Sequence, residues 1–121
     1  MLENTNPLMI LVASPYRSGT NDNAELIQKN VDLMNNTALA IYQAGHLPVL
    51  GEWFALPLIH TAGSTKMGDQ IWNDLFHPVA IRLISKCDAV LRIGGPSSGA
   101  DEMVRIGKEN GKKILFSIDE I

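Results

Sequence analysis

Two short loops rich in glycine and serine hold the residues of this sequence best suited to bind an anion. The first is SPYRSGT (14–20) and the second is GGPSSGADE (94–102), and each follows an apolar run. Free backbone N–H groups just before a helix can donate to a phosphate or carboxylate. Arg17 could clamp a phosphate with two hydrogen bonds, and Ser97 could add a hydroxyl donor. We therefore expect an anion site that uses Ser14, Arg17, Ser18, Gly19, Ser97, Ser98 and Gly99.

The same two loops also have a purely structural interpretation. Gly19 and Gly99 could simply make turns, Ser97 or Ser98 could cap a helix, and Arg17 could lie in solvent. Neither loop is a Walker loop or a GxGxxG fingerprint, so a nucleoside triphosphatase or a dehydrogenase is poorly supported.

Two neighbouring carboxylates, Asp101 and Glu102, end the second loop segment, where a helix is expected to begin. At the start of a helix, acidic residues commonly do no more than complement the helix dipole. One of them could instead point into a ligand crevice as a nucleophile or base, as carboxylates do in glycosyl transfer and hydrolysis. The three histidines have no metal-binding spacing and Cys87 is the only cysteine, so we expect neither a metal nor a cofactor.

The segments around these loops alternate between two hydrophobic patterns. Apolar runs predict strands over residues 8–14, 46–50, 87–95 and 112–118. Spacing of three and four predicts helices over residues 21–44 and 69–86 and a third helix that Gly111 ends. Alternating strands and helices predict a single-domain α/β fold, flavodoxin-like or Rossmann-like, with four to five parallel strands and helices on both faces. Ligands bind such sheets beyond the carboxyl ends of the strands, where both loops would lie.

Three local features modify this prediction. Pro48 weakens the strand over 46–50, and Pro78 predicts that the helix over 69–86 splits or that a second one begins there. Residues 51–68 mix Trp, Phe, Pro and His with Gly and Ser and have no regular period. We expect this segment to be a loop packed over the site, a candidate lid.

The composition indicates one domain and excludes some partners. The chain has 121 residues and a net charge of -3, which gives no electrostatic reason to expect a nucleic-acid polymer as partner. It has no long apolar run and no basic leader, so we expect a cytoplasmic protein without a membrane partner. The apolar segment 53–59 would leave a sizeable patch unless it is covered, which favours a homo-oligomer.

The order of the segments resembles one known family. ILVASPYRSG (10–19), IYQAGHLPV (41–49), CDAVLRIGGPSSGADEM (87–103) and GKKILF (111–116) together resemble the nucleoside 2-deoxyribosyltransferase-like superfamily, including its small bacterial and phage branch. The resemblance implies a flavodoxin-like sheet and a dimer, tetramer or other oligomer whose subunits complete each other's sites. It implies a small-molecule nucleoside or nucleotide as ligand. The reaction would be base exchange on a 2'-deoxynucleoside or hydrolysis of the N-glycosidic bond of a nucleoside 5'-monophosphate, with a glutamate nucleophile and no metal.

The resemblance also implies individual roles. Tyr16, Arg17 and Gly19 match the family's first phosphate loop, with Tyr16 orienting the sugar or the nucleophile. Ser97 and Gly99 match the second loop, and Glu102 is the best match to the nucleophile.

Two departures from the family pattern bear on catalysis. The spacing from Ser97 to Glu102 is one residue shorter than in the hydrolases, so Asp101 could be the inward carboxylate instead. The aspartate that assists the nucleophile in the family aligns with about Ala80. The implied function is therefore an N-glycosidase or deoxyribosyltransferase-like enzyme, or alternatively a nucleotide-binding or sensing module that has lost catalysis. The chain also has a weaker resemblance to lysine-decarboxylase-like phosphoribohydrolases, but it lacks the fuller glycine signature of that group.

Overall fold

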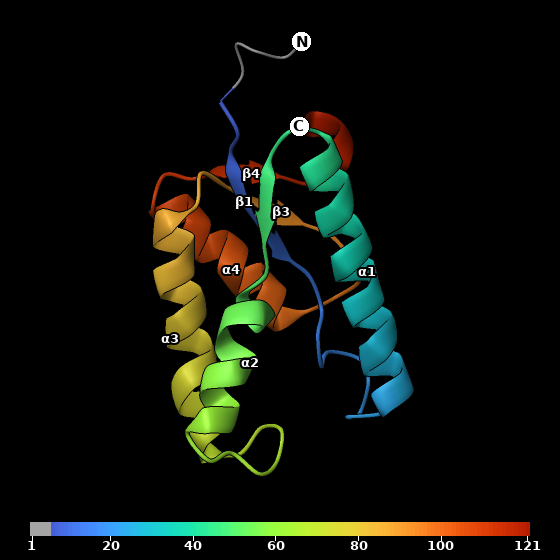
Figure 1. Cartoon of the computed structure of the whole chain (residues 1–121), viewed down its shortest axis with the longest axis vertical. Coiled ribbons are helices and arrows are strands. Elements are labelled where there is room, and N and C mark those ends of the chain that lie inside the picture. Colours follow the sequence, from blue (N-terminus) through green and yellow to red (C-terminus); the bar gives the residue numbers. More distant parts are fainter. Residues whose placement is uncertain (1–5) are drawn as a thin grey trace.

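A four-stranded parallel sheet in the order β2-β1-β3-β4 forms the centre of the protein in a computed structural model, which describes residues 6–121 (Figure 1). The strands are β1 (Met9–Ala13), β2 (Leu47–Val49), β3 (Ala89–Arg92) and β4 (Lys113–Leu115). Ile10 is the register partner of both Pro48 and Ala89, and Val90 is paired with Ile114. The predicted single α/β fold with a flavodoxin-like or Rossmann-like parallel sheet is confirmed.

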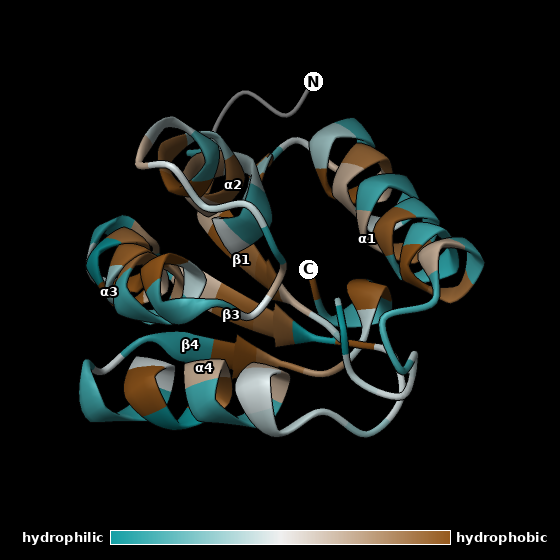
Figure 2. Cartoon of the chain, turned by 90° about the horizontal axis from the view of Figure 1, so that it is seen from below, coloured by the Kyte–Doolittle hydropathy of each residue, from teal (hydrophilic) through white to brown (hydrophobic). Residues whose placement is uncertain are grey.

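Helices cover both faces of the sheet. They are α1 (Ala24–Gln43), α2 (Gly51–Thr61), α3 (Gln70–Lys86) and α4 (Ser98–Glu109), followed by a short 3₁₀ helix, η1 (Ile118–Glu120). Buried residues of α1 pack with one side of the strands, and those of α3 and α4 pack with the other side. Figure 2 shows the apolar strands between α1 and the pair α3 and α4, with hydrophilic colours on the outer faces of the helices.

The pattern of burial explains why each strand has its place. Residues 10–13 of β1 are at most 3% exposed because α1 covers one face and α3 and α4 cover the other. This is why β1 appears in the sequence as an uninterrupted apolar run. Pro48 cannot donate to a ladder, and it is tolerated because β2 is an edge strand.

The prediction of an irregular lid over residues 51–68 is wrong for most of that segment, because Gly51–Thr61 form helix α2. Ala55 and Ile59 are buried against α3, whereas Trp53, Phe54 and Leu58 are apolar but about half exposed. Apolar residues therefore lie on both the buried and the exposed sides of α2, so its sequence shows no amphipathic helical period.

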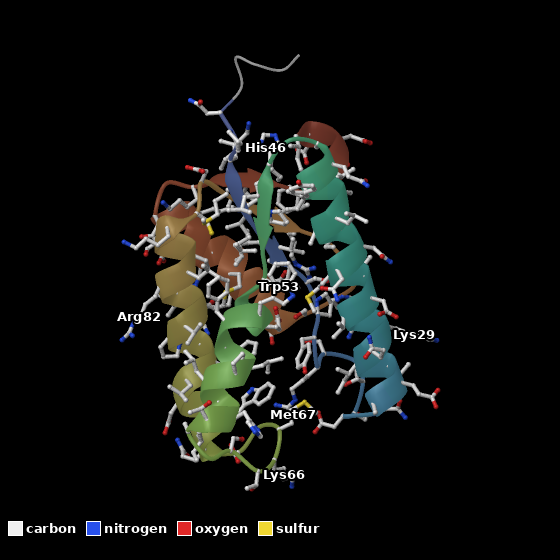
Figure 3. The ribbon with its side chains drawn as sticks, in the orientation of Figure 1. Lys29, His46, Trp53, Lys66, Met67 and Arg82 are labelled. Atoms are coloured by element: carbon white, nitrogen blue, oxygen red, sulfur yellow. The ribbon has the colours of Figure 1, made fainter. Side chains whose placement is uncertain are left out.

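Only the remaining loop, residues 62–69, is irregular. Lys66 and Met67 lie in this loop (Figure 3). Asp69 organises it by accepting hydrogen bonds from the Ser64 hydroxyl at 2.9 Å and from the backbone N–H of Trp72 at 2.9 Å. The loop reaches the first glycine-rich loop, since a Cβ atom on Gly68 would lie only 2.7 Å from Nη1 of Arg17.

The predicted break at Pro78 is also wrong, because α3 runs without interruption from Gln70 to Lys86. Pro57 lies inside α2 in the same way. Both prolines are exposed, so water can hydrogen-bond the carbonyl group that each leaves without a donor. Burial of Ala80 and Ile84 on the opposite side of α3 offsets the local cost.

An apolar groove remains on the surface between α2 and α3. It is lined by Trp53, Phe54, Leu58, Val79, Arg82, Leu83 and Lys86. Within residues 6–121, no helix combines the length and apolar character needed to cross a membrane. The homo-oligomer predicted from the sequence stays a prediction.

A substitution of Ile84 measures how much the packing of α3 against the sheet contributes to stability. Ile84 is fully buried, whereas Ile81 on the same helix is 38% exposed. We expect Ile84→Ala to lower the free energy of unfolding by about 2–5 kcal/mol, because it removes buried methyl groups and leaves a cavity. Ile81→Ala is the matched control and should cost much less. Urea unfolding of both variants measures the difference, and equal losses would contradict the packing described here.

Candidate functional site

A small cavity lies at the carboxyl end of β1, where the strand order reverses. The chain runs from β1 outward to β2 and then crosses to β3 on the other side of β1. Such a switch point is the usual ligand crevice of a parallel sheet. Four elements and their connections form the cavity wall, which consists of Leu11, Val12, Ala13, Ser14, Gly51, Glu52, Ala80, Gly99, Ala100 and Met103.

The two glycine-rich loops meet beside this cavity, as predicted. The Ser18 hydroxyl lies 3.0 Å from the Ser97 hydroxyl in a hydrogen bond that joins them. Ser97 is buried, and its Oγ also accepts from the backbone N–H of Ala100 at 3.1 Å, which caps α4. The structural interpretation of Ser97 as a helix cap is therefore confirmed.

Ser14 is the least satisfied polar group of the site. It is 7% exposed, and its Oγ is the only buried side-chain nitrogen or oxygen of residues 6–121 that has no hydrogen-bond partner. Gly94, at φ +81°, packs against it so closely that a Cβ atom there would lie 2.8 Å from this oxygen. A buried polar group without a partner costs about 1–3 kcal/mol, so an acceptor supplied by a ligand would stabilise this hydroxyl.

The start of α4 supplies a second set of donors. Gly99 and Ala100 line the cavity in the first turn of this 12-residue helix. The Ala100 N–H already donates to Ser97 Oγ, so the donors left at this helix start are the N–H groups of Ser98 and Gly99, where the helix dipole adds partial positive charge. Ser14 and the α4 start therefore place hydrogen-bond donors where an anion could accept from them, and we call this side of the cavity the anion-binding wall. Ser98 is exposed at the first position of α4, and Gly19 (φ +75°) is an exposed turn residue.

Glu52 is the carboxyl that lines the cavity, and sequence reasoning missed it. It lies in the first turn of α2 and is partly buried, and burial raises its pKa from 4.5 to about 7. A hydrogen bond from its own backbone N–H opposes this shift and is the weaker effect. A signal was present, because Glu52 is the only charged residue in the apolar stretch LPVLGEWFALPLI (47–59).

Tyr16 lies close enough to Glu52 for the charge of Glu52 to raise its pKa. Burial is the main cause of the raised pKa of Tyr16, and the Glu52 charge is the second. The Tyr16 ring also stacks on Trp72 with ring centres 6.1 Å apart, and Trp72 stacks on Phe76 at 5.3 Å. The loop after β1 is thus anchored to α3 by aromatic packing.

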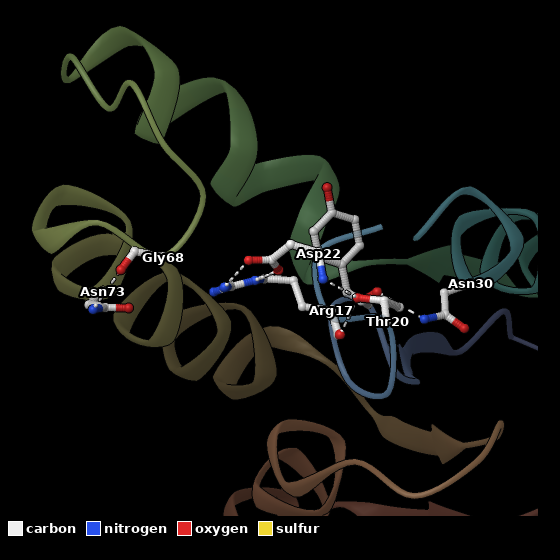
Figure 4. A network of polar contacts seen from close by, with 7 residues as sticks. Arg17, Thr20, Asp22, Asn30, Gly68 and Asn73 are labelled. Atoms are coloured by element: carbon white, nitrogen blue, oxygen red, sulfur yellow. Dashed lines mark hydrogen bonds and ion pairs between the residues drawn. The ribbon is translucent and has the colours of Figure 1, made fainter. Parts of the chain in front are cut away.

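Arg17 does not line the cavity. Its Nε and Nη2 atoms donate to the two carboxylate oxygens of Asp22 at 3.0 and 3.1 Å (Figure 4). The guanidinium also lies 5.7 Å from the centre of the Trp72 ring. The hydrogen bonds from Arg17 hold the pKa of Asp22 below its usual range. The role of Arg17 as a phosphate clamp stays a prediction, and it would require the guanidinium to leave Asp22.

Asp101 and Glu102 are paired with arginines outside the cavity wall. Asp101 accepts from Nε of Arg92 at 3.0 Å. Glu102 accepts from Nε of Arg105 at 2.8 Å, and this bond is the main cause of its lowered pKa. Met103, the next residue along α4, lines the cavity instead. The catalytic roles of Asp101 and Glu102 stay predictions.

Ala80, the residue aligned with the assisting aspartate of the resembled family, does line the cavity. Its side chain is a methyl group that is 3% exposed, and it leaves that part of the wall apolar. Among residues 6–121, no three His, Cys, Asp or Glu side chains gather in a way that could hold a metal ion. The chain matches no protein-family model, and no curated protein sequence matches it significantly.

Ser14 and Ser97 allow a matched test of the anion-binding wall. We expect Ser14→Ala to raise the free energy of unfolding by about 1 kcal/mol, because it removes a buried hydroxyl without a partner. Ser97→Ala should lower it by about 1 kcal/mol, because it removes the α4 cap. Urea unfolding measures both. A loss of stability in Ser14→Ala would show that this hydroxyl has a partner in the free protein.

The raised pKa of Glu52 predicts a pH-dependent penalty on folding. Between pH 4.5 and about 7 the unfolded chain has released this proton while the folded protein still holds it, so stability falls as pH rises through that range. Glu52→Gln removes the penalty and should be up to about 3 kcal/mol more stable than the wild type at pH 8, but no more stable at pH 4.

Glu102→Gln is the contrasting control for this pH experiment. The lowered pKa of Glu102 means that its contribution to stability is present above its unfolded pKa and is lost as pH falls. Its replacement should therefore reduce stability at pH 8. Denaturant unfolding at pH 4, 6 and 8 compares the two variants, and the same pH dependence in both would contradict the burial of Glu52.

Proposed function

We propose that this protein binds a nucleoside 5'-monophosphate or a related nucleoside at the carboxyl end of β1 and cleaves its N-glycosidic bond, by hydrolysis or by transfer to a second base. The observation that carries the proposal is the pairing, within one cavity, of a buried hydroxyl without a partner and a carboxyl with a pKa of about 7. The first group suits an anion, and the second suits proton transfer near neutral pH. The resemblance to nucleoside 2-deoxyribosyltransferase-like proteins supports the substrate class.

The phosphate would be held mainly by uncharged donors. These are the Ser14 hydroxyl and the N–H groups of Ser98 and Gly99 at the start of α4, with the joined hydroxyls of Ser18 and Ser97 beside them. The N–H groups and the dipole of a helix N-terminus favour a bound phosphate. The sugar would then extend toward Glu52 and Tyr16.

A second candidate function is binding without turnover, as in a nucleotide sensor. The observation that favours it is the pairing of Asp101 and Glu102 with arginines together with the methyl group of Ala80 in the cavity wall. A glycosidase normally uses two carboxyl groups with opposed roles. The cavity wall contributes only one among the described residues.

One plate of measurements separates the two functions. The purified protein is incubated with ribo- and deoxyribonucleoside 5'-monophosphates, free base is detected by chromatography, and the melting temperature is recorded. Release of base supports the enzyme. A rise in melting temperature without base supports the sensor, and a hundredfold ligand excess over Kd should add about 2.7 kcal/mol of stability. If neither effect occurs, the proposed function is rejected.

The phosphate assignment has its own variant. Ser14→Ala should weaken binding of the 5'-monophosphate about tenfold, equivalent to about 1.4 kcal/mol. Its effect on the corresponding nucleoside without phosphate should be small. Ser85→Ala, at an exposed position near the end of α3, is the matched control. Equal weakening of nucleotide and nucleoside binding by Ser14→Ala would contradict the assignment.

A further inference from the structure

We propose that Glu52 is the general acid and base of the N-glycosidic cleavage, so that the carboxyl that reacts in this protein comes from the start of α2 and not from α4. This inference rests on the proposed function and deepens it. It would place proton transfer on a residue that the resemblance to the deoxyribosyltransferase-like family does not point to.

Position is the first argument. Glu52 is the only Asp or Glu among the described residues in the cavity wall, which it shares with Ser14 and the first turn of α4. Asp101 and Glu102 of α4 are hydrogen-bonded to Arg92 and Arg105. A phosphate held by Ser14 and α4 would therefore bring the attached sugar near Glu52 and not near Glu102.

The surroundings of Glu52 suit a proton donor. The walls contributed by β1, α3 and α4 are apolar or neutral, with Ala80 and Met103 among them. Burial keeps the carboxyl protonated up to about pH 7, as the raised pKa indicates. Tyr16, in the loop after β1, is the titratable group that the Glu52 charge affects, and the neighbouring Arg17 acts on Tyr16 in the opposite direction.

The contacts of Glu52 among the described residues give it no structural role. Within residues 6–121 its carboxyl forms no ion pair and no hydrogen bond to another residue, and burial disfavours its charged form. A carboxyl that lowers the stability of the folded state above pH 4.5 fits a functional role better than a structural one. Active sites commonly keep such destabilising groups.

The reaction balances with one carboxyl. Glu52 gives its proton to a ring nitrogen of the base while the C1'–N bond breaks and its electron pair stays with the base, which leaves neutral. The sugar becomes an oxocarbenium ion, and the Glu52 carboxylate stabilises its positive charge. A water oxygen then bonds to C1' and gives a proton to Glu52, which restores the acid. In base exchange, an N–H of the incoming base replaces the water.

The decisive experiment compares two substrates in Glu52→Gln. A 5'-monophosphate with an ordinary purine needs a proton on its leaving base, whereas 7-methylguanosine 5'-monophosphate carries a positive charge on the base, which leaves neutral without one. We expect kcat for the ordinary purine to fall at least a hundredfold. The fall for the 7-methylated substrate should be less than tenfold, and binding measured by thermal shift should be retained. Glu25→Gln, at an exposed position on α1, is the matched control.

Each other outcome overturns a defined claim. If the wild type releases no base from either substrate, the proposed function fails and the inference fails with it. If the wild type is active and Glu52→Gln is equally active, or loses both substrates alike, only the inference fails. Loss of base release in Glu102→Gln with Glu52→Gln still active would assign the reaction to α4.

A measurement on the wild type tests the inference without any variant. The kcat for the ordinary purine nucleotide should fall as pH rises above about 7, because the acid form of Glu52 is lost. The 7-methylated substrate should not show this fall. The same alkaline fall with both substrates would overturn the role of Glu52 as general acid.

Discussion

The burial of β1 on both faces is the constraint on which the rest of the structure depends. Its residues 10–13 are nearly inaccessible, and the strand hydrogen-bonds to β2 on one side and β3 on the other. The carboxyl end of β1 is therefore fixed in position by two ladders and two layers of helices. Ser14 follows β1 directly, so its position is fixed as well, and so is the part of the cavity wall that it forms.

The hydrogen bond between Ser18 and Ser97 carries this constraint to the second loop. It links the segment after β1 to the cap of α4, so the first turn of α4 is held against the end of β1. Gly94 contributes by its lack of a side chain, since any Cβ atom there would collide with Pro15 and the Ser14 oxygen. The anion-binding wall is thus built from backbone placement more than from charge.

Sequence reasoning could predict the features that depend on hydrophobic pattern and topology. The apolar run of β1 and the spacing of Met34, Ala38 and Ile41 in α1 follow directly from which faces are covered. The meeting of the two loops follows from the strand order. Helix α2 could not be recognised, because Trp53 and Leu58 make its exposed side apolar as well.

The direction of single side chains could not be predicted in the same way. One residue along an α-helix is a rotation of about 100°. The difference between Glu102, paired with Arg105, and Met103, in the cavity wall, is one such step. The position of Glu52 cannot be predicted for a related reason. Residues 51–68 have no regular hydrophobic period. The sequence therefore does not reveal that Glu52 lies at the edge of the sheet where the strands end.

Two groups of the cavity, the Ser14 hydroxyl and the Glu52 carboxyl, each have an energetic cost in the free protein. The Ser14 hydroxyl is buried without a partner, and the Glu52 carboxyl is partly buried with its charged form disfavoured. Each lowers the stability of the free protein, and a ligand would relieve both by accepting a hydrogen bond from the Ser14 hydroxyl and from the protonated Glu52 carboxyl. A nucleoside monophosphate supplies both acceptors at once, with its phosphate oxygens at one end and a basic ring nitrogen at the other. Under the proposed function, the same ligand chemistry would therefore satisfy both groups, with the phosphate on the side of Ser14 and the base on the side of Glu52.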